Sequence, residues 1–113
     1  MALTLAAREA AVLAVSALGN SISLHTADPG TTGASEATGG SPAYARKTTT
    51  WSAGASDGVV DGSPVVFDVP AGTYTHIGQW NGSTFIGGYP LSSSTGALPG
   101  QQTVTVTPTL TAP

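Results

Sequence analysis

Apolar residues follow one another with little polar interruption at the start of the chain, in the segment LAAREAAVLAVSAL, residues 5–18. Its polar positions are Arg8, Glu9 and Ser16. Thr4 is a suitable N-cap, because its hydroxyl can accept a hydrogen bond from a free N–H of the first helical turn. Gly19 and Asn20 suit the left-handed conformation that often ends a helix. We therefore predict a helix over residues 4–18, lying on the rest of the fold or against a partner subunit, since an apolar helix is poorly suited to water on all sides.

After residue 20 the pattern changes to alternation of apolar with Ser and Thr residues, interrupted by Gly, Pro, Asn and Asp, which is typical of β-strands and turns. The expected strands cover residues 21–26, 45–51, 65–69, 73–80, 84–89 and 102–107. Asn81-Gly82 favours a tight hairpin turn, because both residues tolerate a positive φ. Trp80 and Phe85 should therefore lie on neighbouring strands.

Short strands at this spacing predict a mainly β fold: a small antiparallel β-sandwich or flattened barrel with one N-terminal α-helix and a long Gly/Ser/Thr loop. With 113 residues the chain is expected to form a single domain, residues 1–113, with the helix at 4–18, the sandwich at 21–107 and an extended tail at 108–113. The candidate core consists of Ile22, Leu24, Trp51, Val66, Phe67, Val69, Ile77, Trp80, Phe85, Ile86, Leu91, Val104 and Val106. Val66 and Phe67 cannot share one face, because neighbouring side chains of a strand point to opposite sides.

Two stretches rich in small and polar residues interrupt this pattern, a long loop at residues 27–43 and a shorter one at 92–101. Connections above about 12 to 15 residues are uncommon in compact domains and are usually functional or disordered. We predict that residues 27–43 form a flexible arm that becomes ordered on a neighbouring protein. The partner-contact candidates are Asp28, Thr31, Thr32, Glu36, Tyr44, Arg46 and Lys47. Arg46 and Lys47 are either ordinary solvated strand residues or a basic pair that meets an acidic surface.

Charge and composition exclude several classes of function. Only 8% of the residues are charged and the net charge is −3, so nucleic-acid binding is not expected. The chain has no cysteine, and therefore neither disulfides nor thiolate metal sites. The apolar N-terminal run is shorter than the roughly 20 residues that span a bilayer, and its Arg8 is followed at once by Glu9, unlike a secretory leader. We expect a soluble protein made in the cytoplasm, without a membrane role.

Candidate chemistry is sparse. Asp28 could orient His25 as an acid–base pair, but Asp28 opens a typical Asp-Pro-Gly turn, in which its carboxylate would cap backbone amides. His25 and His76 could share a metal ion with Asp57, Asp61 or Asp68, yet the aspartates fall mostly in turns and lack the spacing of a calcium loop. No nucleophile or further carboxylate converges with these groups. We therefore predict no catalytic, cofactor-binding or metal site, and no cofactor.

Five aromatic residues could instead form a flat platform for a sugar ring. They are Tyr44, Trp51, Tyr74, Trp80 and Tyr89. Core or interface roles are the competing interpretation, because few Asp, Asn or Arg residues stand near them to orient a sugar.

The run SLHTADPGTTGASEATGGSPAYARKTTTW, residues 23–51, resembles a family of small tailed-bacteriophage virion proteins, common in phages of actinobacteria. VVFDVPAGTYTHIGQWNG, residues 65–82, and the segment from Phe85 to Leu91 are similar to the same family. The resemblance covers nearly the whole chain after the helix. Its members are usually labelled tail-fibre or minor tail proteins, and small β-domains of this kind also serve as capsid decoration or minor capsid proteins.

The resemblance implies a non-enzymatic virion structural protein, made in the cytoplasm of the bacterial host. We lean towards a capsid decoration or cement protein, because the chain shows no trimerising stalk or shaft repeat and its helix, loop and tail could bridge subunits. A minor tail or tail-fibre subunit is the alternative, and a carbohydrate-binding β-sandwich module is the alternative of another class. The expected partners are the major capsid protein or tail proteins, and copies of the chain itself.

Overall fold

The computed structural model describes residues 3–55 and 57–111. Its elements are α1 (Leu5–Ser16), β1 (Ser21–His25), β2 (Lys47–Thr48), β3 (Trp51–Ser52), β4 (Val59–Gly62), β5 (Val65–Val69), β6 (His76–Asn81), β7 (Thr84–Pro90), β8 (Gln102–Val106) and β9 (Thr109–Thr111). All strand pairs in this part of the chain are antiparallel. The prediction of a mainly β, antiparallel fold with an N-terminal helix is confirmed.

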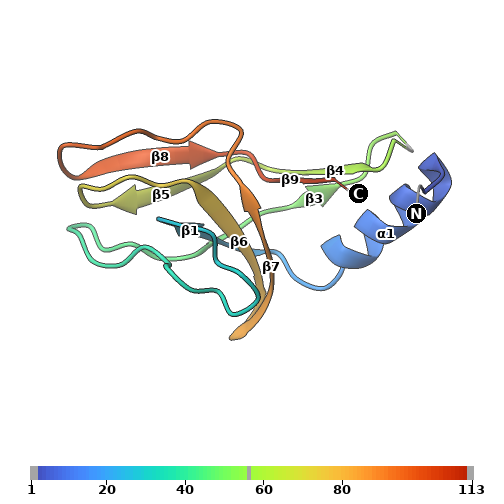
Figure 1. Ribbon diagram of the computed structural model, residues 1–113, viewed down its shortest axis with the longest axis horizontal. Coiled ribbons are helices and arrows are strands. Elements are labelled where there is room, and N and C mark those ends of the chain that lie inside the picture. Colours follow the sequence, from blue (N-terminus) through green and yellow to red (C-terminus); the bar gives the residue numbers. More distant parts are fainter. Residues whose placement is uncertain (1–2, 56, 112–113) are drawn as a thin grey trace.

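The strands of the described residues form three small sheets. Figure 1 shows how their strands are arranged. The largest has the strand order β2-β1-β6-β7, the second has β3-β4-β9, and β5 pairs with β8. Ile22, Leu24 and Ile77 of the largest sheet pack against Phe67 and Val69 of β5, so these two sheets form the layers of the sandwich. The molecule is elongated, 44 × 26 × 24 Å, and Figure 1 shows α1 at one end, beyond the sheet that contains β4.

Strand parity settles which residues enter the core. Phe67 is fully buried, whereas its neighbour Val66 is 49% exposed, so the prediction of Val66 as a core residue is wrong. The hairpin prediction is confirmed, since Trp80 pairs with Phe85 and Gly82 has a φ of 58°. Asn81 itself pairs with Thr84, so it flanks the turn and only the glycine takes the left-handed conformation.

A second apolar cluster lies at the helix end of the molecule. Val12 of α1, Val60 of β4 and Leu110 of β9 are buried together, and Trp51 and Tyr89 contact both this cluster and the main core. The sequence pattern does not predict β4, and it predicts an extended tail at residues 108–113. Residues 109–111 instead form β9 along β4, because Leu110 completes this cluster; residues 112–113 lie outside the described part.

The strand expected at residues 45–51 is divided between two sheets. Lys47–Thr48 pair with β1, while Trp51–Ser52 pair with β4. Between them Thr49 is buried, and its hydroxyl donates a hydrogen bond to the Ser63 carbonyl at 2.8 Å. The chain therefore changes sheet at a point where a polar side chain is satisfied inside the fold.

The helix begins as predicted, because the Thr4 hydroxyl accepts a hydrogen bond from Ala7 N at 3.1 Å. It ends earlier than expected, with Ala17 as a right-handed C-cap, and neither Gly19 nor Asn20 has a positive φ. The predicted left-handed stop is therefore wrong. Gly19 is needed for space instead, since a Cβ there would overlap the backbone carbonyl of Trp80 in β6.

We predict that Gly19→Ala lowers the free energy of unfolding by about 1–3 kcal/mol, the usual cost of forcing extra atoms into a packed site. The added methyl would push against the β6 backbone, which cannot shift without disturbing its pairing with β1 and β7. Urea denaturation of the purified protein measures the change. The matched control is Gly100→Ala, because a Cβ at Gly100 meets no heavy atom within 4 Å. Equal losses in both variants would contradict the steric explanation.

Candidate functional site

The long loop after β1 folds back onto the sheet, so the prediction of a flexible arm is wrong. Residues 35–37 run antiparallel to the end of β1: Ala37 N donates to Leu24 O at 2.8 Å, and Thr26 N donates to Ser35 O at 2.9 Å. This segment continues the edge of β1 that β2 covers at Ser21 and Ile22. The backbone of β1 therefore finds partners along both edges.

The first part of the loop covers the face of the sheet. The Asp28 carboxylate accepts a hydrogen bond from Gly30 N at 2.9 Å, which confirms its role as a turn-forming cap. Pro29 is buried, and it lies so close to Gly88 that a Cβ at that position would overlap its ring. Gly33 has a φ of 79° and leaves room for Trp80, whose ring atoms would lie 2.6 Å from an added Cβ. The loop is held by close packing rather than left free.

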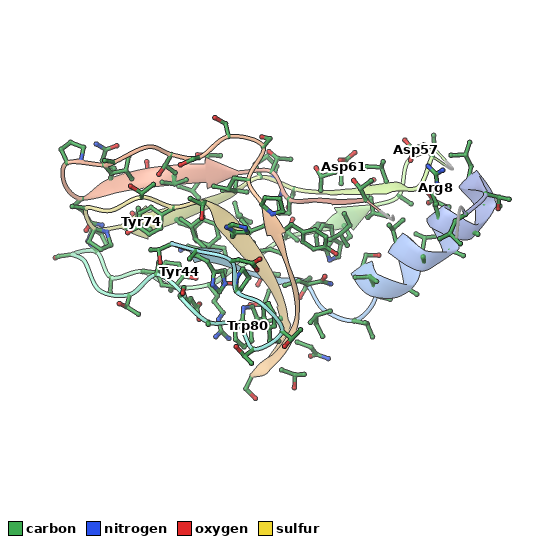
Figure 2. The ribbon with its side chains drawn as sticks, in the orientation of Figure 1. Arg8, Tyr44, Asp57, Asp61, Tyr74 and Trp80 are labelled. Atoms are coloured by element: carbon green, nitrogen blue, oxygen red, sulfur yellow. The ribbon has the colours of Figure 1, made fainter. Side chains whose placement is uncertain are left out.

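Three of the predicted contact residues meet in one hydrogen-bonded cluster of Glu36, Tyr44 and Arg46. Arg46 binds the Glu36 carboxylate with two hydrogen bonds, Nε to Oε2 and Nη2 to Oε1, both 2.9 Å long. The Tyr44 hydroxyl donates to Glu36 Oε2 at 2.8 Å and accepts from Leu24 N at 3.0 Å. The guanidinium also lies over the Trp80 ring, 3.5 Å from its centroid. Figure 2 labels Tyr44 and Trp80 in this part of the molecule.

The charges of this cluster are adjusted by burial and by hydrogen bonds. Burial disfavours the Glu36 carboxylate, but the hydrogen bonds from Arg46 and Tyr44 outweigh it and leave the pKa of Glu36 below its ordinary value. The same carboxylate raises the pKa of Arg46. Burial and the neighbouring Glu36 raise the pKa of Tyr44. The pair is therefore ionised, and Tyr44 is a neutral donor, over the ordinary pH range.

A second hydrogen-bonded chain lies beneath the loop, on the polar face of β1. Trp80 Nε1 donates to Ser23 Oγ at 2.8 Å, Ser23 Oγ lies 2.6 Å from His25 Nε2, and His25 Nδ1 lies 2.8 Å from Ala34 O. A carbonyl can only accept, so Nδ1 carries the proton and Nε2 accepts from the serine hydroxyl. Burial lowers the pKa of His25. The neutral imidazole therefore satisfies every member of the chain.

Ser23 and His25 lie as close together as a nucleophile and its base, and the sequence pattern did not predict this pair. Ser23 and His25 are both 0% exposed, and Trp80 Nε1 donates a hydrogen bond to the serine hydroxyl oxygen. Gly78 lies against both side chains, closing the face of β6. A substrate has no path to Ser23 Oγ in this arrangement. The pair could have been predicted from the segment SISLH, because side chains two residues apart on a strand lie on the same face.

His76 pairs with His25 across β1 and β6, as the two-histidine hypothesis requires. Its Nδ1 lies 2.8 Å from the Thr75 hydroxyl. No group of three or more His, Cys, Asp or Glu side chains comes together within residues 3–55 and 57–111. His25 and His76 therefore lack a third ligand from the described residues.

The remaining contact candidates stay at the surface. Asp28, Thr31 and Thr32 are exposed on the loop, and Lys47 is half-buried in β2. Their contact with a partner stays a prediction. The structure thus brings together Glu36, Tyr44 and Arg46 and leaves the others apart from that cluster.

The aromatic rings proposed as a sugar platform are mostly engaged inside the protein. Trp80 is 8% exposed and lies under Arg46, and Tyr74 is 2% exposed. Tyr44 stacks on Phe67 with 5.9 Å between the ring centroids. Trp51 Nε1 donates to Gly19 O at 2.9 Å. These rings do not form one open, flat surface.

A groove of about 500 Å³ lies between the end of β7, the segment after it and β8. Its walls carry Ile77, Tyr89, Pro90, Leu91, Ser92, Ser93, Thr95, Val104, Thr105, Val106, Thr107 and Thr109. None of these side chains is charged, so the groove offers hydroxyl groups and apolar surface but no titratable acid or base for chemistry at neutral pH. Among the helical residues that the structure describes, no stretch is long and apolar enough to cross a membrane.

A comparison with protein families identifies one family that matches the chain. The family model described as Podophage GP4 fiber I protein gp80 matches residues 5–113. Searches of curated proteins and of solved structures found no match. The family match spans the helix and every strand, so it concerns the whole described fold.

We predict that Glu36→Gln lowers the free energy of unfolding by about 1–3 kcal/mol, the range for hydrogen bonds to a charged group. The variant keeps the shape of the side chain but removes the charge that Arg46 and Tyr44 bind. Urea denaturation measures the loss. Limited trypsin digestion adds a local measurement, because the chain has only three Lys and Arg residues, and we expect faster cleavage at Arg46. Asp68→Asn is the control, since Asp68 makes no side-chain hydrogen bond or ion pair within the described residues. If this control matched Glu36→Gln in both measurements, the cluster would not be what holds the loop.

We also predict a loss of stability on mild acidification, caused by His25. Its pKa is lowered in the folded protein, so the unfolded chain binds the proton first as the pH falls through about 6.5. The contribution of neutral His25 to the free energy of unfolding is fully present above that pH. Below it the free energy of unfolding declines, by at most about 1.4 kcal/mol per pH unit, until the pKa of His25 in the folded protein is reached. Urea midpoints between pH 7.5 and 5.5 test this above the range in which Glu36 titrates. His25→Gln should be less stable at pH 7.5, because it breaks the hydrogen bonds with Ser23 and Ala34, and it should lose the slope. An unchanged slope in His25→Gln would refute the assignment.

Proposed function

Since the chain belongs to the family of the podophage GP4 fiber I protein gp80, a family of phage structural proteins, we propose that it is a tail-fibre subunit of a bacteriophage virion. This proposal replaces the capsid decoration role that the sequence analysis favoured. The family description supports the tail alternative, and the absence of a shaft repeat from one small chain does not weigh against membership of a fibre.

The observation that carries the proposal is the extent of the family match, residues 5–113. It includes the N-terminal helix, which the sequence resemblance did not cover. A match confined to the β-strands would be compatible with a common sandwich used for many purposes. Because helix and strands match together, the proposed role concerns the whole arrangement.

A structural role also agrees with the chemistry of the described residues. The one close Ser–His pair is sealed beneath the loop, and the groove beside β8 has no charged side chain. We therefore propose that the protein acts without catalysis, through contacts with other virion proteins and with copies of itself. Asp28, Thr31, Thr32 and Lys47, which remain at least partly accessible, are candidates for such contacts.

The location of the protein in the particle tests the proposal. In purified virions of the phage that encodes the chain, an antibody against the protein with gold label is expected to mark tails and not heads. Particles assembled without the protein should keep DNA-filled heads with unchanged resistance to heat, and should lose fibre density in electron micrographs. Label on the heads, or heads that become heat-sensitive, would return the assignment to a capsid protein.

A further inference from the structure

The polarity of α1 is the reverse of that expected for a helix at the surface of a soluble protein. The residues from Leu5 to Leu18 that are exposed are all Ala or Leu: Leu5, Ala6, Ala7, Ala10, Leu13, Ala14, Ala17 and Leu18. The polar residues of this stretch are turned inward instead, since Glu9 is buried and Arg8 and Ser16 are half-buried. A surface helix normally directs its charged side towards water.

Specific contacts hold the polar residues on the inner side. The Glu9 carboxylate accepts a hydrogen bond from Gly58 N at 3.0 Å, at the turn before β4. Arg8 lies against Gly58, where an added Cβ would be 2.9 Å from its own Cβ, and its Nε donates to Leu3 O at 3.2 Å. Figure 2 shows Arg8 beside the turn that carries Asp57. The helix therefore cannot rotate its polar side outward without breaking these contacts and withdrawing Val12 from its cluster.

The outward side presents an unusual amount of apolar surface. Leu5, Leu13 and Leu18 are 57%, 42% and 51% exposed, and they are three of the four large apolar residues that the described chain exposes. Single exposed apolar side chains are common, but a contiguous apolar patch marks a site of association. The patch also lies at one end of the elongated molecule, clear of the β5–β8 layer (Figure 1). A second molecule can therefore reach it without meeting the sandwich.

The composition of the patch indicates what kind of partner it binds. A helix that lies on a membrane surface carries Lys or Arg along its polar side and aromatic residues at the boundary. Within residues 5–18 the one basic residue is Arg8, which is half-buried against Gly58, and no aromatic residue is present. A partner recognised by charge would meet no complementary charge, because every exposed side chain of this stretch is Ala or Leu. The patch is complementary to an uncharged surface like itself.

We propose that the outward side of α1 is a self-association surface that binds the same side of α1 in a second copy of the chain. Ala6, Ala10 and Ala14 follow one another at intervals of four residues and lie on one side of the helix, so two helices can approach closely there. Leu13 of each copy then packs over the alanines of the other. A symmetric contact of this kind uses one patch twice, and no like charges face each other across it.

Sedimentation velocity of the full chain at increasing concentration tests the proposal. The wild type is expected to associate, and Leu13→Glu, which places a charge in the contact, should raise the dissociation constant by at least about tenfold, equivalent to about 1.4 kcal/mol. Val66→Glu is the matched control, because Val66 is 49% exposed on β5, away from the helix, and should leave association unchanged. Circular dichroism and thermal unfolding verify that both variants fold.

Cysteine cross-linking provides an independent measurement, since the chain has no cysteine of its own. Ala10→Cys is expected to give a disulfide-linked dimer on mild oxidation at concentrations where Val66→Cys does not. A wild type that stays monomeric at all concentrations, or equal association of Leu13→Glu, would overturn the proposal. Binding to anionic phospholipid vesicles without self-association would overturn it in favour of a membrane contact. The outcome is independent of the fibre role, because gold label on heads would refute that role and leave self-association through α1 intact.

Discussion

Burial of β1 on both faces is the constraint on which the rest of the structure depends. Its side chains alternate between apolar and polar, a pattern that normally leaves one face in water. Here Ile22 and Leu24 enter the core of the sandwich, while Ser23 and His25 on the opposite face are equally buried. A buried polar side chain is costly unless it is hydrogen-bonded. The fold must therefore supply both a cover and partners for this second face.

The long loop supplies the cover and one of the partners, which explains why it is long. It provides Ala34 O for His25, while Trp80 from β6 provides the donor for Ser23. It also places Glu36 beside Arg46, whose guanidinium lies over the Trp80 ring. Because both side chains are partly exposed, water weakens the purely electrostatic attraction between Glu36 and Arg46. The hydrogen bonds of this pair and its stacking instead fix the cover over a face that would otherwise be open to water.

The sequence predicted those features that depend on near neighbours. Alternation identified the strand of Ile22 and Leu24, and the dipeptide Asn81-Gly82 identified the hairpin. The path of the loop was not predictable, because its composition resembles that of a disordered segment and its order comes from contacts with β1, β6 and β7. The sequence also gave no sign that Gly19 is required by the Trp80 carbonyl or that residues 109–111 pair with β4. For the site, Glu36, Tyr44 and Arg46 were candidates for contact outside the chain, whereas they bind one another inside it.

Side chains are arranged in opposite ways at the two ends of the molecule: the sandwich buries polar side chains, whereas α1 exposes apolar ones. The first arrangement serves folding, and the second serves assembly. In the sandwich, the buried side chains of Ser23 and His25 find their hydrogen-bond partners within the chain. At the other end, α1 has 12 residues, which is marginal for a helix on its own, and Val12 is its one buried apolar residue. A protein that binds the outward side of α1 in its folded form stabilises that end by mass action. The helix is therefore the part of the described fold in which stability and assembly are most closely coupled.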